Sequence, residues 1–169
     1  MKIEHTRYED IDDIMRIINQ AKSYFKNHHI NQWQDGYPNE ESIQKDINQN
    51  KSYVLINNDR IIGTMYFAIE DDPSYSYIEN GHWITSHQPY AVIHRIVVDE
   101  KLKGQNLAYE LVQYAVNQCK NKHIQSIRID THQDNLSMQA FLKKHDFKPC
   151  GTIYLENGDP RIAFEKILA

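Results

Sequence analysis

The chain has 169 residues, a formal net charge of -4 at pH 7, 40% hydrophobic residues and 25% charged residues. This composition is ordinary for a soluble globular protein, and the length suffices for one domain with a substantial core. The acidic balance and a pI near 6.1 argue against a nucleic-acid-binding surface. No apolar run approaches membrane-spanning length and the N-terminus lacks a signal-peptide apolar region, so we expect a cytoplasmic protein without membrane binding.

The chain has two cysteines, Cys119 and Cys150, and their spacing is not that of metal ligands. Cys119 falls on the apolar face of a predicted helix, which favours a reduced, buried thiol. We therefore expect neither a disulfide nor a metal site.

The first half of the chain predicts a strand, two helices and a hairpin. Thr6 and Glu9 have the spacing of a capping box, and apolar residues from Ile11 to Phe25 recur behind them at helical spacing. The predicted elements are a strand at 2–7, this helix, a helix at 39–49, and a hairpin of strands 52–56 and 60–69. Residues 70–89 form a long polar and aromatic loop, and loops of this length are often functional.

The second half alternates strands and helices more regularly. We predict a buried strand at 90–98, a helix at 107–119, a strand at 124–131, a helix at 135–145, and a hairpin of strands 147–156 and 161–168. A strand–helix–strand unit implies a right-handed crossover and a parallel strand pair, whereas the hairpins are antiparallel. Because no repeat or linker interrupts the chain, residues 1–169 are predicted to form a single domain with a mixed sheet.

The loop between residues 98 and 107 is the best candidate for an anion site. It joins a buried strand to a helix. The first N–H groups of that helix lack intrahelical partners and form the positive end of its dipole. Such an arrangement suits a phosphate, and Lys103 adds a positive charge. The alternative is a plain helix N-terminus.

Two motifs resemble those of the GNAT family of acyl-CoA-dependent N-acetyltransferases. Lys103-Gly104-Gln105-Asn106-Leu107-Ala108 resembles the family's Gln/Arg-x-x-Gly-x-Gly/Ala motif, and the segment from Asn135 to Phe147 resembles its second signature, an Asn followed by a helix ending in Gly-Phe. The resemblance extends from Ile3 to Lys166. It implies an α/β (α+β) single-domain GNAT-like fold, with a mixed, mostly antiparallel sheet of about seven strands, a splayed central parallel pair and flanking helices.

Three positions depart from the family pattern. Asn106 replaces the middle glycine of the first motif, and asparagine is the non-glycine residue that best tolerates a positive φ. Asp146 replaces the glycine that ends the helix of the second motif, which is a local change of turn chemistry. Leu142 stands where many members carry the tyrosine that protonates the leaving thiolate.

The resemblance implies acetyl-CoA as the cosubstrate and assigns residues to it. Backbone groups of the central strand would lie beside the thioester and pantetheine, and the loop would hold the pyrophosphate, with a contribution from the start of the last helix. The residues so assigned are Ile96, Val97 and Val98, then Lys103, Gly104, Gln105, Asn106, Leu107 and Ala108, and finally Asn135 and Ser137.

Acetyl transfer to an amine needs a base, because a protonated amine has no lone pair with which to attack. His94 is the first candidate: it lies two residues from Val92, where some members carry a glutamate base, and strand alternation puts both on one face while Arg95 points the other way. The alternative for His94 is a core histidine. Glu79 is a second candidate to bind or deprotonate the amine, or else an exposed loop carboxylate.

Tyr154 and Ser137 are the candidates to replace the missing tyrosine acid. No cysteine lies near the expected site in sequence, which favours direct attack in a ternary complex over an acyl-enzyme.

For the acceptor side we select four aromatic residues and two polar residues that follow a parallel strand, where open α/β sheets bind ligands. These are Trp33, Tyr37, Trp83 and Tyr90, and Asp130 and His132. Aromatic residues in such loops also serve as core, and Asp130 could instead cap the next helix.

The expected partner is an amine of a small molecule or peptide whose identity stays open, and the resemblance leaves a homodimer open as well. Two other functions are retained: a non-catalytic acyl-CoA sensor, suggested by Asn106 and Leu142, and an interaction or nucleic-acid-binding protein, which the net charge disfavours.

Overall fold

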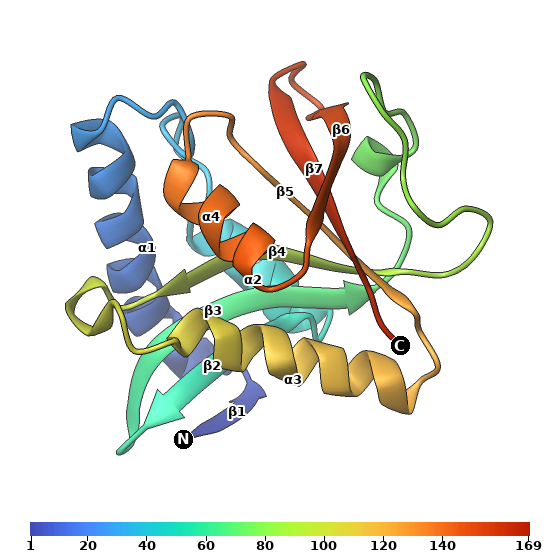
Figure 1. Ribbon diagram of the computed structural model, residues 1–169. Helices are drawn as coiled ribbons and strands as arrows, with labels where there is room; N and C mark the ends of the chain where they lie inside the picture. Colours follow the sequence, from blue (N-terminus) through green and yellow to red (C-terminus); the bar gives the residue numbers. More distant parts are fainter. The chain divides into compact units, whose positions relative to one another are not determined.

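The computed structural model describes all 169 residues, as seven strands, four α-helices and three short 3-10 turns (Figure 1). The strands are β1 (Lys2–His5), β2 (Ser52–Asn57), β3 (Arg60–Ile69), β4 (Ala91–Val98), β5 (Ser126–Thr131), β6 (Lys148–Tyr154) and β7 (Pro160–Ile167). The helices are α1 (Ile11–Asn27), α2 (Glu40–Asn48), α3 (Leu107–Asn121) and α4 (Leu136–Lys144), and the turns are η1 (Tyr8–Asp10), η2 (Pro73–Tyr75) and η3 (Glu100–Leu102). Every strand and helix expected from the sequence is present, with ends that differ by a few residues.

The strands form one mixed sheet in the order β1-β2-β3-β4-β5-β7-β6. β4 and β5 are parallel, with Ala91 opposite Ile127 and Val92 opposite Arg128, whereas the pairs β1–β2, β2–β3, β5–β7 and β6–β7 are antiparallel. The predicted fold class, with a parallel pair within a mostly antiparallel seven-stranded sheet, is therefore confirmed.

The chain divides into two compact units. The first unit comprises residues 1–67 and 94–115, and the second comprises residues 68–93 and 116–169. A single domain over residues 1–169 stays a prediction.

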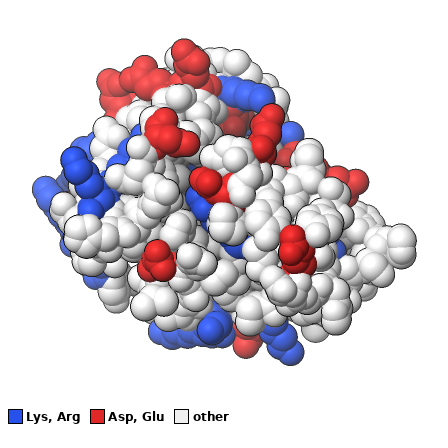
Figure 2. Space-filling model, turned by 90° about the horizontal axis from the view of Figure 1, so that it is seen from above, with Lys and Arg blue, Asp and Glu red and all other residues white.

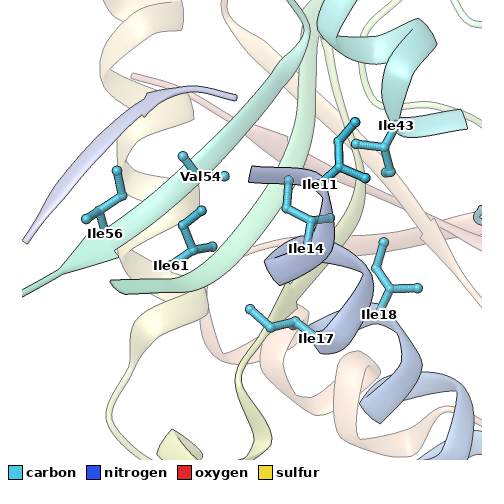
Figure 3. Packing of buried hydrophobic residues seen from close by; sticks show 8 residues of the cluster. All are labelled: Ile11, Ile14, Ile17, Ile18, Ile43, Val54, Ile56 and Ile61. Carbon is cyan, nitrogen blue, oxygen red and sulfur yellow. The ribbon is translucent and has the colours of Figure 1, made fainter. Parts of the chain in front are cut away.

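The core of the first unit is built largely from isoleucine. Apolar residues of α1 spaced three and four apart form one stripe, which packs on side chains of α2, β2 and β3 (Figure 3). Its members are Ile11, Ile14, Ile17, Ile18, Ile43, Val54, Ile56 and Ile61, all buried.

The two helices of the first unit begin with different capping arrangements. Asn39 caps α2, because its side chain accepts a hydrogen bond from the Ser42 N–H at 2.9 Å. The capping box predicted for Thr6 is wrong: the Thr6 hydroxyl instead bonds the Ser52 hydroxyl at 2.7 Å. The Asp10 carboxylate instead accepts from the Arg7 N–H at 2.8 Å and so closes the start of η1, the turn that leads into α1, whereas α1 itself has no side-chain cap. The local pattern assigned the Thr6 hydroxyl to the helix, but this hydroxyl bonds Ser52 of β2 instead.

In the second unit, α4 ends at a turn in which Asp146 takes the place of the glycine found in the resembling motif. Asp146 has a φ of 68°, the left-handed conformation that usually favours glycine. The Phe147 N–H then donates to the Leu142 carbonyl at 2.9 Å, which closes the helix end. Leu142, Phe147, Ile153 and Phe164 are among the largest fully buried side chains.

Both cysteines belong to the second unit, where they are free and buried. Burial raises the pKa of the Cys119 thiol to about 12 and that of the Cys150 thiol to about 11. The prediction that Cys119 is buried is confirmed.

No helix combines the length and apolar character needed to cross a membrane. On the face seen in Figure 2, basic and acidic side chains both occur among uncharged atoms, as expected for a chain with 19 basic and 23 acidic residues.

Candidate functional site

In the first unit, the segment after β4 is anchored to α1 by a buried carboxylate. Asp99 accepts hydrogen bonds from the Lys101 N–H at 3.1 Å and from Arg16 Nη1 at 3.1 Å, and Gln20 Oε1 accepts from the Glu100 N–H at 3.0 Å. Burial alone would raise the pKa of Asp99, but these donors outweigh it and hold the pKa below its usual range. The Asp99 carboxylate is therefore ionised at neutral pH, and its hydrogen bonds fix the start of the loop.

The loop then turns into α3 and leaves a row of backbone donors unpaired. Gly104 and Asn106 have positive φ values of 87° and 57°, so Asn106 adopts the backbone conformation that the sequence analysis required of it. The first helical bond runs from the Glu110 N–H to the Asn106 carbonyl at 3.3 Å. The N–H groups from Gly104 to Ala108 donate to no protein acceptor. This run of donors at the positive end of a helix dipole is suited to an anion.

The charged and polar side chains of this loop lie at the surface. Lys103, Gly104, Gln105 and Asn106 are exposed. Lys103 Nζ lies 4.2 Å from the centroid of the Tyr24 ring, which keeps its charge beside the loop through a cation–π contact.

The strand before this loop is kinked at Arg95, whose φ is 50°. The regular alternation used for the sequence prediction therefore ends there, and the expectation that Arg95 points away from His94 is wrong. Both side chains contact Tyr66: the His94 ring centroid lies 5.5 Å from the Tyr66 ring, and the Arg95 guanidinium lies 4.8 Å from it. Ile96 is buried and Val97 and Val98 are half-buried.

Arg95 is held by a buried carboxylate that the sequence analysis missed. Its Nη2 lies 2.5 Å from Asp46 Oδ2 on α2, and its Nη1 donates to the Tyr37 hydroxyl. Burial raises the pKa of Asp46 despite the opposing effects of Arg95 and His94. An aspartate on the inner side of an amphipathic helix was the signal available in the sequence, since carboxylates are rarely buried without a partner.

In the second unit, the structure brings Glu79 and Tyr154 together. Glu79 forms a two-way backbone bridge to Thr152, with N···O distances of 2.9 and 2.8 Å. Its carboxylate interacts with the hydroxyls of Tyr154 and Tyr77. The pKa of Tyr154 is raised by burial and by Glu79, whereas that of Tyr77 is raised mainly by its hydrogen bond to Glu79. Both phenols thus keep their protons at neutral pH.

The start of α4 uses Asn135 as its cap. The Asn135 side chain is buried and accepts from the Met138 N–H at 3.1 Å, and Ser137 is exposed in the first turn. Leu142 is fully buried, so this position holds core rather than a proton donor.

The aromatic acceptor candidates do not form one set. Trp33 packs edge-on against Phe25, with ring centroids 5.7 Å apart, and against the isoleucine core, which is the core role considered as its alternative. Tyr37, in the same unit, is 42% exposed and contacts Arg95. Trp83 and Tyr90 belong to the second unit.

The polar acceptor candidates are both engaged in the second unit. Asp130 Oδ2 accepts from the Tyr75 hydroxyl at 2.6 Å, and Asn135 rather than Asp130 caps the following helix. His132 Nδ1 accepts from the Asp134 N–H at 3.0 Å. Burial, followed by the charge of Arg161, lowers the pKa of His132.

The sequence analysis also missed Arg128 and Glu165, an ion pair in the second unit with Nε 3.2 Å from Oε2. Arg128 lies between the buried Ile127 and Ile129 of β5, and a charged residue in a buried strand indicates that the fold supplies a partner. No group of three or more His, Cys, Asp or Glu side chains is arranged to hold a metal ion.

The family model described as "Acetyltransferase (GNAT) family" matches residues 12–147. A solved GNAT-family acetyltransferase from Streptococcus agalactiae is 28% identical, with a TM-score of 0.89 over 99% of this chain and 95% of that one. A GNAT-family acetyltransferase from Listeria monocytogenes is 16% identical, with a TM-score of 0.74 over 99% and 94%. The PaiA N-acetyltransferase from Thermoplasma acidophilum, solved with coenzyme A, is 16% identical, with a TM-score of 0.73 over 98% of each chain. No curated protein matches the chain.

Proposed function

This chain belongs to the GNAT family of acetyltransferases, and from that premise we propose that it transfers an acetyl group from acetyl-CoA to a primary amine of a small molecule or peptide. The observation that carries the proposal is the run of unpaired N–H groups from Gly104 to Ala108. The left-handed conformation of Asn106 supports it, because this residue adopts the positive φ that the family's middle glycine would otherwise supply.

Acetyl-CoA supplies the activated acetyl group as a thioester. In the proposal, backbone donors from Gly104 to Ala108 bind its pyrophosphate, and Lys103 adds a positive charge at the surface. Asn135 and Ser137 are proposed to contribute from the start of α4. Ile96, Val97 and Val98 offer backbone groups beyond the kink at Arg95, to hold the pantetheine and donate to the acyl oxygen.

His94 remains the first candidate for the base that takes the proton from the amine. It is half-buried beside Tyr66 and near the Asp46 carboxylate. Glu79 is the second candidate, and its contact with Tyr154 suits it to bind a cationic amine as well. Tyr154 is the proposed proton donor to the leaving thiolate, because its raised pKa keeps the phenol protonated.

Direct attack of the amine is favoured over an acyl-enzyme. Both cysteines are buried with pKa values of about 12 and about 11, and neither is an accessible nucleophile. Localisation in the cytoplasm and a homodimer are kept as proposals.

A non-catalytic acyl-CoA sensor is the second candidate function. It is favoured by Leu142, which fills the usual position of the tyrosine acid with a fully buried apolar side chain. A sensor would bind acetyl-CoA by the same loop and release no CoA in the presence of amines.

The loop assignment is tested by titrating acetyl-CoA calorimetrically into Gly104→Val and Gly158→Val variants. Both glycines have similar positive φ values, 87° and 91°, and a Cβ at either would meet no atom within 4 Å, so the backbone strain is matched. We expect Gly104→Val to weaken binding at least about tenfold, since a β-branched residue resists positive φ, and Gly158→Val to leave it unchanged. Equal affinities of the two variants would contradict the proposal.

The reaction is tested by measuring CoA release with polyamines, aminoglycosides, amino acids and peptides as acceptors. Release with any amine supports an acetyltransferase, whereas tight acetyl-CoA binding without release supports the sensor. Salt-dependent DNA binding without affinity for acetyl-CoA would overturn both.

A further inference from the structure

The long segment 71–90 of the second unit lines an open, solvent-accessible cavity of about 730 Å³. Its walls are almost entirely supplied by that segment, including Trp83 and Tyr90, with Arg128 of β5 as the one contribution from the sheet. The volume falls within the range of small-molecule sites. Trp83 and Tyr90 were candidates for the acceptor side in the sequence analysis, but the acetyl transfer proposed above assigns the cavity no role.

The guanidinium of Arg128 lies between two aromatic rings in the cavity wall. Its central carbon lies 4.2 Å from the centroid of Trp83 and 4.0 Å from that of Tyr90. Trp83 is itself fixed, because its indole N–H donates to the Tyr75 carbonyl at 2.9 Å. The Arg128 side chain is 7% exposed, so the guanidinium can move little and is open to a ligand only at one edge.

Two of the three guanidinium nitrogens are already committed within the protein. Nε lies 3.2 Å from Glu165 Oε2, and Nη2 donates to the Thr85 carbonyl at 2.8 Å. Nη1 has no acceptor in the protein and is not sealed from solvent. Since Arg128 lines the cavity, the uncommitted N–H groups are those available to a ligand.

Glu165 fixes the position of the Arg128 guanidinium through their ion pair. Its side chain is fully buried, and its oxygens also accept from the Ser126 hydroxyl at 2.5 Å, the Thr85 hydroxyl at 2.5 Å and the Ile84 N–H at 2.6 Å. These donors fix both the carboxylate and the segment that carries Trp83. The guanidinium is therefore preorganised, which lowers the entropic cost of binding.

We propose that this cavity binds a small aromatic or apolar carboxylate, with the carboxylate on Arg128 Nη1 and the ligand body against the aromatic wall. A guanidinium edge matches a planar carboxylate in shape and charge. A doubly charged phosphate fits less well, because Glu165 already balances the charge of Arg128 and Asp71 adds a carboxylate to the lining. His82 and His87 offer further polar contacts from the same segment.

The test uses Trp83 as a reporter in a Trp33→Phe background. The chain has two tryptophans, so this variant leaves Trp83 as the sole indole, in contact with Arg128 and in the cavity wall. Phenylacetate should change its fluorescence saturably, and phenylacetamide, which has the same shape without the charge, should bind at least about tenfold more weakly. No saturable response to phenylacetate, or tighter binding of phenylphosphonate, would overturn the proposal.

Arg128→Gln in the same background should abolish the preference for phenylacetate. Arg161→Gln is the matched control, because Arg161 is also buried on a strand of this unit but does not line the cavity. Should Arg128→Gln fail to fold, the arginine Nε–H signals of the natural protein provide the second measurement. Phenylacetate must then shift the Arg128 signal more than phenylacetamide does, and an unshifted signal contradicts the site. Neither acetyl-CoA nor an amine is present, so the result is independent of the proposed acetyl transfer.

Discussion

The ion pair between Asp46 and Arg95 should hold β4 in its kinked form, and replacing Asp46 tests this. The two side chains are 8% and 12% exposed, and their charged atoms are 2.5 Å apart. In an Asp46→Ala variant, Arg95 would keep its charge in a place with little access to water. The left-handed backbone at Arg95, which the pair restrains, would lose its support.

The cost can be worked out from these contacts. Removing one member of a buried ion pair costs about 3–5 kcal/mol. The guanidinium would retain its contacts with Tyr37 and Tyr66, so we expect the lower end, about 3 kcal/mol. At about 2–4 °C per kcal/mol for a chain of this size, the unfolding temperature should fall by about 6–12 °C. Thermal unfolding followed by circular dichroism measures this.

Measurements of kcat and of acetyl-CoA affinity should distinguish the role of the kink at Arg95 from that of the cofactor loop. Because Arg16 and Gln20 anchor that loop independently, Asp46→Ala should leave acetyl-CoA affinity nearly unchanged while lowering kcat. Replacing both partners, as Asp46→Leu with Arg95→Met, should restore stability, because apolar pairs of similar size substitute well for buried ion pairs, but it should not restore kcat. An Asp46→Ala variant with the natural melting temperature and kcat would refute this reasoning.

Substitutions at four further positions test other features. Asn106→Gly should keep acetyl-CoA affinity, whereas Asn106→Val should reduce it about tenfold, because valine resists a positive φ and glycine does not. Calorimetry measures both affinities, and equal values would contradict the prediction. Leu142→Tyr should lower the melting temperature by overpacking a fully buried site, at a cost of about 1–3 kcal/mol, without raising kcat; unchanged melting would contradict this. His94→Ala should lower kcat at least about a hundredfold if His94 is the base, and an unchanged kcat makes His94 structural. Burial alone would raise the pKa of Glu165, but the hydroxyls of Ser126 and Thr85 and the charge of Arg128 hold that pKa below its usual value. The ionised carboxylate therefore stabilises the folded protein fully at neutral pH, and this stabilisation is lost as the pH falls through the lowered pKa. The melting-temperature gap between Glu165→Gln and the natural protein should therefore shrink on acidification, and a constant gap would contradict it.

Local patterns were enough to predict the elements and the fold. Helical spacing located the stripe from Ile11 to Ile18, and the tolerance of asparagine for positive φ anticipated the backbone at Asn106. These properties depend on a residue and its near neighbours in sequence, so a single chain suffices to infer them.

Long-range pairing could not be predicted in this way. Thr6 bonds Ser52 across 46 residues, and the local capping pattern cannot reveal that competing partner. Asp46 with Arg95, and Arg128 with Glu165, join distant segments, so the position of one charge can indicate burial but cannot identify its partner. The kink at Arg95 has no sequence signature comparable to a glycine. Of the candidate site, the backbone-built loop was therefore described well and the side-chain clusters poorly.

The buried thiols have a practical consequence for enzymology. At pH 8, pKa values of about 12 and about 11 leave about one Cys119 in ten thousand and one Cys150 in a thousand as thiolate. An ordinary thiol with a pKa of about 8.5 is about one quarter ionised under the same conditions. A chromogenic disulfide reagent should therefore leave the folded protein untouched, and the colour it develops during turnover would report liberated coenzyme A alone, without a protein blank that drifts with time.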